Sequence, residues 1–254
     1  MQTFLEDGAH ALGIKPGITA VCGSGGKSTL LGAMGRALAQ AGKTVALATS
    51  THMYPVAGVP WKSATHRLSD TAWRSAALHT GGCPCERCAA MSGSLYQVGV
   101  MDVETGKLSA PAQGFDEVAR CASHVLVEAD GSHRLPLKAH AAHEPAIPTG
   151  AANLIWVVGA SGFGKPVGEA VHRPEIFCKL TEARLDDGAT PELVAKALTT
   201  ELESIEASTG LTACVLLNQV DGEQHMELAL RFKRALGRSI VAGSLQGDSF
   251  TVLD

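Results

Sequence analysis

A glycine-rich segment near the N-terminus places the strongest constraint on the fold. Residues 21–29 read Val-Cys-Gly-Ser-Gly-Gly-Lys-Ser-Thr and stand between an apolar run over 18–22 and a helix expected over 28–41. A glycine turn between a strand and a helix directs backbone N–H groups inward, and the helix N-terminus adds partial positive charge. The segment therefore predicts a phosphate-binding loop inside an α/β fold.

The predicted loop offers a nucleotide both backbone and side-chain groups. Lys27 is expected to reach the terminal phosphates, and Ser28 is expected to be a ligand of Mg²⁺. The usual pattern carries a glycine five residues before Gly26, where this chain has Val21, so the loop is of the short form. A glycine turn that only begins a helix is the alternative. The predicted nucleotide-binding residues of the loop are Gly23, Ser24, Gly25, Gly26, Lys27, Ser28 and Thr29.

Apolar runs alternate with helical patterns along most of the chain, which favours a parallel sheet covered by helices on both faces. The expected strands are 18–22, 44–49, 95–101, 124–128, 154–158, 213–217 and 239–242. The expected helices are 28–41, 69–78, 114–121, 223–236 and one that begins at 190–192. We predict one α/β domain over 1–254, a P-loop NTPase-like three-layer sandwich with a mostly parallel sheet. Residues 53–110 follow the alternation poorly and are expected to be an insertion.

Two carboxylates mark the end of the strand expected over 124–128. Glu128 and Asp130 stand two residues apart, and in such folds this strand end lies beside the phosphate loop. One carboxylate can hold Mg²⁺ directly or through water and can orient an attacking water. With Ser28, both are therefore predicted Mg²⁺ ligands, and with Lys27 both are candidate catalytic residues. Solvated acids at a strand end are the alternative.

A third polar strand end reads Thr49-Ser50-Thr51-His52. Hydroxyl and imidazole groups at this position face the same crevice and could contact Mg²⁺, the γ-phosphate or the substrate. His52 is therefore a candidate catalytic residue, and a purely structural histidine is an equally compatible interpretation.

The strand expected over 213–217 ends in Asn218-Gln219-Val220-Asp221. A carboxylate at such a turn can read a nucleobase, because it accepts hydrogen bonds from ring N–H and exocyclic amine groups. Guanine-binding proteins usually carry a lysine where this chain has Gln219. The sequence is therefore compatible with either ATP or GTP as the nucleotide. Asn218 and Asp221 are the predicted base-binding residues, and an ordinary turn is the alternative.

Cationic side chains follow the acidic strand end and recur further along the chain. Arginine suits bidentate phosphate contacts, and lysine acts as a point charge. These groups could lie over the γ-phosphate or hold an anionic substrate such as a pterin phosphate, and a solvated loop is the alternative. The predicted substrate-binding residues are Arg134, Lys138, His143 and Arg173.

Three cysteines cluster inside the expected insertion. Cys83, Cys85 and Cys88 follow His79 closely, so four ligands of the zinc type stand together in the sequence. Three interpretations stay open: a Zn²⁺ or iron–sulfur site, a thiol site that handles sulfur or selenium, and exposed thiols without a role.

Charge and hydropathy argue against several classes of protein. A net charge of -4 and a pI of about 6.2 argue against a nucleic-acid protein held by a general basic surface. No run approaches the ~18 apolar residues of a membrane span, and the N-terminus lacks a signal-peptide pattern. We expect a cytoplasmic protein without nucleic-acid or membrane partners.

The segment 128–148, Glu-Ala-Asp-Gly-Ser-His-Arg-Leu-Pro-Leu-Lys-Ala-His-Ala-Ala-His-Glu-Pro-Ala-Ile-Pro, resembles the signature of the YqeC family. These proteins are described as accessory proteins of selenium-dependent molybdenum hydroxylases. Other pieces match the family in order: the loop at 23–29, Thr-Ser-Thr-His-Met at 49–53, Val-His-Arg-Pro-Glu at 171–175 and the turn at 218–221. The resemblance covers nearly the whole chain.

The resemblance implies a Mg²⁺-dependent P-loop NTPase that helps to mature a molybdenum hydroxylase or its selenium- or molybdenum-containing cofactor. The same pieces are distantly similar to the central domain of Mur ligases and folylpolyglutamate synthetases, which slightly favours ATP over GTP. Two alternatives stay open. One is an ATP-dependent kinase or Mur-like ligase that acts on a small anionic substrate, and the other is a non-hydrolysing, nucleotide-gated carrier of a metal or chalcogen.

Overall fold

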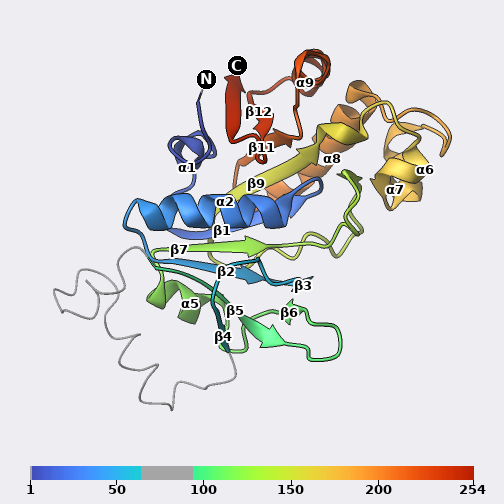
Figure 1. Cartoon of the computed structure of the whole chain (residues 1–254). Coiled ribbons are helices and arrows are strands. Elements are labelled where there is room, and N and C mark those ends of the chain that lie inside the picture. The colour runs from blue at the N-terminus through green and yellow to red at the C-terminus, as the bar shows by residue number, and fades with distance from the viewer. Residues whose placement is uncertain (1, 64–93) are drawn as a thin grey trace.

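The computed structural model describes residues 2–63 and 94–254, and most of its strands form one large mixed sheet (Figure 1). The strands of this sheet are β1 (Gly17–Gly23), β2 (Val45–Thr49), β3 (His52–Met53), β4 (Trp61–Ser63), β5 (Leu95–Met101), β6 (Leu108–Ser109), β7 (His124–Glu128), β9 (Ala151–Gly159), β11 (Ala213–Asn218), β12 (Ile240–Ser244) and β13 (Ser249–Leu253). Their order is β13-β12-β11-β9-β1-β7-β2-β5-β6-β3, and β4 pairs with β5. Two short strands, β8 (Leu137–Lys138) and β10 (Val171–His172), pair with each other.

The helices begin where the sequence carries start signals. Helix α2 follows the glycine loop directly, and the Thr190 hydroxyl caps α8 by accepting a hydrogen bond from the Leu193 N–H at 3.3 Å. Within residues 2–63 and 94–254, no helix has the length and apolar character needed to cross a lipid bilayer. The helices are α1 (Gly8–Ala11), α2 (Lys27–Gln40), α5 (Phe115–Cys121), the 3₁₀ turn η1 (Ala160–Gly162), α6 (Val167–Ala170), α7 (Pro174–Thr181), α8 (Pro191–Thr209) and α9 (Glu223–Leu236).

Strand β1 lies at the centre of the parallel part of the sheet, between β7 and β9. Because β2 lies beyond β7 and β11 lies beyond β9, the chain crosses from one side of β1 to the other. Glu128 at the end of β7 pairs in register with Val21 in β1 and with Thr49 in β2. The carboxyl ends of these three strands therefore meet where the strand order reverses, which is the place where α/β sheets bind ligands.

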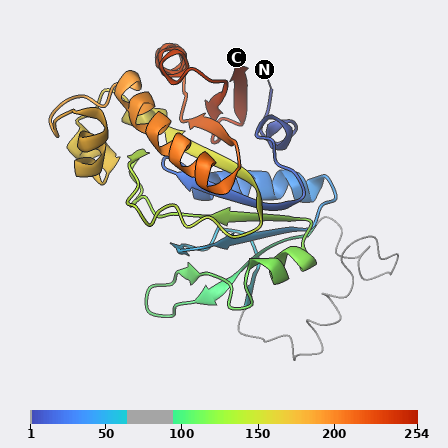
Figure 2. The same ribbon diagram turned by 180° about the vertical axis from the view of Figure 1, so that it is seen from behind.

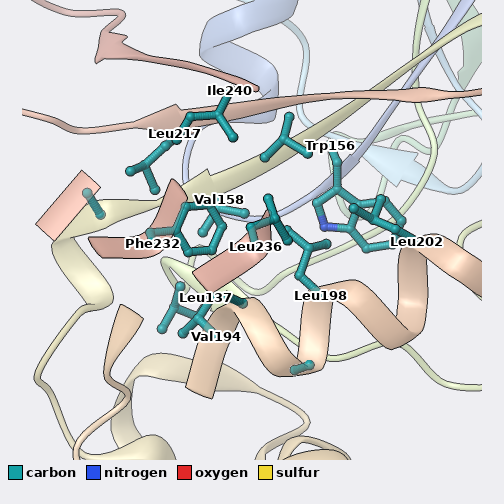
Figure 3. Close-up of a cluster of buried hydrophobic side chains, with 14 of the residues drawn as sticks. Leu137, Trp156, Val158, Val194, Leu198, Leu202, Leu217, Phe232, Leu236 and Ile240 are labelled. Carbon is teal, nitrogen blue, oxygen red and sulfur yellow. The ribbon is translucent and has the colours of Figure 1, made fainter. Parts of the chain in front are cut away.

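Helices cover both faces of the sheet, as the two opposite views show (Figures 1 and 2). Successive side chains of β9 point to opposite faces of the sheet. Ile155 and Val157 belong to the core beneath α1 and α2, whereas Trp156 and Val158 belong to the core formed with α8 and α9. Figure 3 shows this second core, in which Leu137, Trp156, Val158, Val194, Leu198, Leu202, Leu217, Phe232, Leu236 and Ile240 are labelled.

The three-layer α/β sandwich predicted from the alternation is confirmed. The expected strands of the described residues are present, with small differences at their ends, and so are the helices expected to begin near residues 28, 114, 190 and 223. The antiparallel edge strand β13 was not expected. Strands β4 and β5, which fall inside the expected insertion, pair with each other and continue the main sheet beside β2. The helix expected over 69–78 lies outside the described residues.

Candidate functional site

A cleft of about 1180 Å³ opens where β1, β2 and β7 end. The glycine loop and the first turn of α2 form its floor at residues 25–29. Residues 51–57 form one wall, and residues 131–135 form another. Three strand ends that are far apart in the sequence therefore face one cleft.

Close packing explains the glycines of the loop. At Gly25, where φ is +90°, a Cβ atom would lie 2.4 Å from the Cα of Gly159. At Gly26, where φ is +129°, it would lie 2.4 Å from the Asn218 amide nitrogen. Both positions therefore require glycine for backbone conformation and for space.

The loop presents unpaired backbone donors to the cleft. In the described part of the chain, the N–H groups of Gly25, Gly26, Lys27 and Ser28 have no protein acceptor. The N–H of Ser24, in contrast, donates to the carbonyl of Val157 at 2.8 Å. Donors that converge at the start of a 14-residue helix form an anion-binding site, because the helix dipole adds partial positive charge there.

Lys27 lies at the base of the cleft and is held in place by protein groups. Its ammonium donates to the carbonyl of Gly23 at 2.7 Å and to the hydroxyl of Ser132 at 3.3 Å, and it lies 2.9 Å from Asp130 Oδ1. The side chain is only 4% exposed. The lysine is therefore paired with a carboxylate beside the anion-binding N–H groups.

Asp130 is the centre of a buried ion cluster. Its side chain is 0% exposed, and its Oδ1 faces Lys27. Its Oδ2 accepts a hydrogen bond from the N–H of Gly23 at 2.9 Å. The same oxygen lies 2.5 Å from His140 Nε2 and 3.5 Å from Lys138 Nζ. Burial alone raises the pKa of Asp130, but the three cations outweigh burial and hold this pKa well below its usual range.

His140 connects Asp130 to helix α8. Its backbone N–H donates to Glu201 Oε1 at 2.5 Å, and its Nδ1 lies 3.2 Å from Glu201 Oε2. Burial lowers the pKa of His140, but Asp130 and Glu201 outweigh that effect and raise it. No sequence pattern marks Glu201 as part of this cluster, because it stands 61 residues after His140 on a helix of ordinary composition.

Glu128 is placed differently from Asp130 and faces the cleft. Its Oε2 accepts a hydrogen bond from the Ser28 hydroxyl at 2.7 Å, and both residues line the cleft. Burial raises the pKa of Glu128, opposed by the charge of Lys27 and by the Ser28 hydrogen bond. The Thr49 hydroxyl donates to the Glu128 carbonyl at 2.9 Å and fixes the end of β7 against β2.

The donor set of Ser28 and Glu128 fits Mg²⁺. A hydroxyl and a carboxylate oxygen are hard oxygen ligands, and they stand side by side beside the loop. Asp130, the third predicted ligand, has both carboxylate oxygens engaged by cations and a backbone N–H. The geometry therefore favours Ser28 and Glu128 as ligands, with Asp130 behind them.

The predicted base-binding residues lie at and just after the end of β11, on the side of β1 opposite to β7 and Glu128. The Asn218 amide donates to the Gly25 carbonyl at 2.8 Å, and its oxygen accepts from the N–H of Leu245 at 3.0 Å. Asn218 thus links the glycine loop to the segment that follows β12. Asp221 is exposed and does not line the cleft, whereas Gln219 does.

The predicted substrate cations separate into two groups. Arg134 lines the cleft. The Lys138 side chain is 0% exposed and lies 3.2 Å from Glu144 Oε2, which also accepts a hydrogen bond from Arg173 Nε at 3.0 Å. These two cations hold the 131–144 segment against β10 and do not line the cleft, nor does the exposed His143.

Glu144 gives the fold a pH dependence. Burial raises the pKa of this carboxyl, but the Arg173 hydrogen bond and the Lys138 charge outweigh it and lower the pKa to about 2. The resulting stability is present above the ordinary value of 4.5 and is lost as the pH falls toward about 2. We expect the urea midpoint of the wild type to fall more steeply over this range than that of Glu144→Gln. Parallel pH profiles for the two proteins would contradict this assignment.

Two further predicted sites remain. His52 is exposed at the start of β3 and lines the cleft. The four predicted zinc-type ligands, His79, Cys83, Cys85 and Cys88, lie outside the described residues.

Comparison with known proteins places these features in a family. The model of the YqeC protein family matches residues 19–175, a span that includes the loop, both acidic residues and the 131–144 segment. "Uncharacterized protein YqeC" of Escherichia coli (strain K12) is 31% identical over 193 residues, which cover 70% of this chain and 63% of that relative. The chain therefore spans less than two thirds of the length of this relative. Because the family model covers more than half of the chain, the protein belongs to the YqeC family.

Proposed function

We propose that the protein is a Mg²⁺-dependent nucleotide-binding protein of the P-loop NTPase type, with ATP as the first candidate and GTP as the second. The observation that carries this proposal is the set of unpaired N–H groups at Gly25, Gly26, Lys27 and Ser28 on the floor of the cleft. Such a set takes phosphate oxygens without further rearrangement of the backbone.

The ion cluster around Asp130 suits the exchange of Lys27 between two anions. Lys27 pairs with Asp130, and a bound triphosphate would offer it a second set of anionic oxygens. When Lys27 turns to the phosphate, Asp130 keeps His140 and Lys138 as partners. The carboxylate is then still paired, so the change leaves no isolated buried charge.

Mg²⁺ would be held by Ser28 and Glu128 and would supply positive charge against the phosphate oxygens. His52 and Glu128 line the cleft and are the candidates for orienting an attacking group. Asp130 is fully buried, and we assign it a positioning role for Lys27 and for the N–H of Gly23.

The biological role is inferred from the family. The YqeC resemblance extends the proposal to an accessory protein in the maturation of a molybdenum hydroxylase or its cofactor. A kinase or ligase activity is the second candidate, and the size of the cleft favours it, because the walls at 51–57 and 131–135 leave room beside the loop. ADP formation that requires a second substrate would separate this activity from simple hydrolysis.

The metal ligands give a direct test of the proposal. We expect Ser28→Ala and Glu128→Gln each to lower nucleotide affinity at least about tenfold in the presence of Mg²⁺, and to have little effect in its absence. Calorimetric titration measures both conditions. Ser208→Ala, at the far end of α8, is the control and should bind as the wild type does. Equal losses with and without Mg²⁺ would contradict the assignment of the ligands.

A further inference from the structure

Besides the residues of the loop, an exposed aromatic ring and three cations line the cleft. Tyr54 is 53% exposed, and Arg36, Lys107 and Arg134 line the cleft with it. Lys107 Nζ lies 5.1 Å from the centre of the Tyr54 ring, and Arg134 Cζ lies 5.6 Å from it. We call these four residues the cationic rim.

Strand pairing and a loop build the rim from distant parts of the chain. In the antiparallel pair of β3 and β6, Met53 lies opposite Leu108, so Tyr54 and Lys107 leave the pair side by side. Arg134 comes from the segment after β7 and adopts a positive φ of 63°. Its contact with the Tyr54 ring joins the two walls of the cleft.

The wall that carries Tyr54 is held firmly against the sheet and α2. The buried Gln97 side chain of β5 accepts from the N–H of Val56 at 2.8 Å and donates to the carbonyl of Val59 at 2.7 Å. A Cβ atom on Gly32 of α2 would lie 3.0 Å from a Val56 methyl group, so the wall packs closely on that helix. Arg36 stands one helical turn further along α2. The rim is therefore fixed relative to the loop that begins α2.

The cations of the rim lack carboxylate partners among the residues that the structure describes. In the described part of the chain, Arg36, Lys107 and Arg134 form no ion pair with a carboxylate. The two carboxylates that line the cleft are engaged elsewhere, Glu128 with Ser28 and Glu144 with Lys138 and Arg173. Lys107 and Arg134 beside the Tyr54 ring, with Arg36 lining the same cleft, therefore attract an anion.

The position of the rim separates it from the expected place of the nucleobase. The turn at 218–221 follows β11, which lies on the β9 side of β1. Tyr54 and Lys107 of the rim adjoin β3 and β6, which lie on the other side, beyond β7, β2 and β5. Arg134 follows β7, which is on that side of β1 as well. Of the turn at 218–221, Gln219 lines the cleft. A nucleotide with its phosphates on the loop and its base toward Gln219 leaves the rim open to a second molecule.

We propose that the cationic rim binds a second substrate, a planar ring compound that carries phosphate or carboxylate groups; this inference rests on the proposed function for the place of the nucleotide. The tyrosine ring and the arginine guanidinium both stack on planar rings. The three cations bind the anionic groups of the same molecule.

A fluorescent planar anion tests the rim directly. Pyrenetetrasulfonate is titrated by fluorescence anisotropy into the protein saturated with Mg²⁺ and a non-hydrolysable ATP analogue. We expect binding that Tyr54→Ala and Arg134→Ala each weaken at least tenfold and that Tyr54→Phe changes less than twofold. Lys179→Ala removes an exposed cation of α7 and is the matched control, which should leave binding unchanged.

Two further titrations distinguish failure of the rim from failure of the proposed function. Lys27→Ala should lose the ATP analogue and keep pyrenetetrasulfonate. Binding of the probe through Tyr54 in a protein that binds no nucleotide would support the rim and refute the proposed function. Displacement of the probe by the ATP analogue, together with weaker nucleotide binding in Tyr54→Ala, would overturn the rim as a separate site.

The same titration with inositol hexakisphosphate, a polyanion without a planar ring, tests the preference for a ring. Tyr54→Ala should weaken its binding less than threefold, and Arg134→Ala should weaken it as strongly as it weakens the probe. Equal loss of both ligands in Tyr54→Ala, or probe binding that neither substitution changes, would overturn the inference.

Discussion

Asp130→Ala is expected to lower the free energy of unfolding by about 3–5 kcal/mol, because it removes one member of a fully buried ion cluster. The substitution leaves Lys27 without its carboxylate and removes a partner of His140 and Lys138. It also leaves the N–H of Gly23 without its acceptor at 2.9 Å. Urea denaturation followed by circular dichroism measures the change.

Glu192→Ala is the matched control for this measurement. Glu192→Ala also removes an ion pair, which Glu192 forms with Arg231 at 2.9 Å. The side chains of Glu192 and Arg231 are 49% and 47% exposed. An exposed pair contributes at most about 1 kcal/mol. A loss in Asp130→Ala no larger than the loss in Glu192→Ala would contradict the account of a buried, strongly coupled cluster.

Gly25→Ala is expected to weaken nucleotide binding by about 100-fold, equivalent to about 2.7 kcal/mol. The added methyl group would lie 2.4 Å from the Cα and 2.5 Å from the backbone nitrogen of Gly159, and neither backbone atom can rotate away. The loop must therefore shift, and its N–H groups lose their common direction. Calorimetry measures the affinity.

Gly13→Ala distinguishes crowding in the loop from the general effect of alanine at a positive φ. Gly13 has a φ of +64°, and a Cβ atom there meets no atom within 4 Å. We expect its nucleotide affinity to equal that of the wild type. Normal affinity in Gly25→Ala would show that the loop does not bind the phosphates in the manner proposed.

The sequence predicts those parts of the molecule that depend on local signals. The glycine loop is recognisable because its glycines, its lysine and the start of α2 are contiguous in the chain. The buried strands are recognisable because both of their faces are covered, so each reads as an apolar run. In the edge strand β13 only Phe250 is buried and Val252 is exposed, so its sequence forms neither an apolar run nor a regular alternation that would predict a strand.

Long-range pairing decides the parts that the sequence does not reveal. Asn218 stands at a turn that suits base recognition, but its amide bonds to Gly25, which is 193 residues away. Lys138 and Arg173 belong to cationic clusters in the sequence, and only the pairing of β8 with β10 shows that Glu144 engages both. Tyr54 and Lys107 become neighbours through the pairing of β3 with β6, which no local pattern indicates.

The proposed function requires that the glycine loop bind the phosphates of a nucleotide together with Mg²⁺. Calorimetric titration of ATP and GTP, each with and without Mg²⁺, into the wild type and Lys27→Ala measures this binding. Lys27→Ala leaves His140 and Lys138 beside Asp130, so we expect it to fold, and its thermal unfolding verifies this. We expect Mg²⁺-dependent binding of one nucleotide by the wild type and an affinity at least about tenfold lower in Lys27→Ala. Failure of the wild type to bind either nucleotide, or equal binding by both proteins, would contradict it.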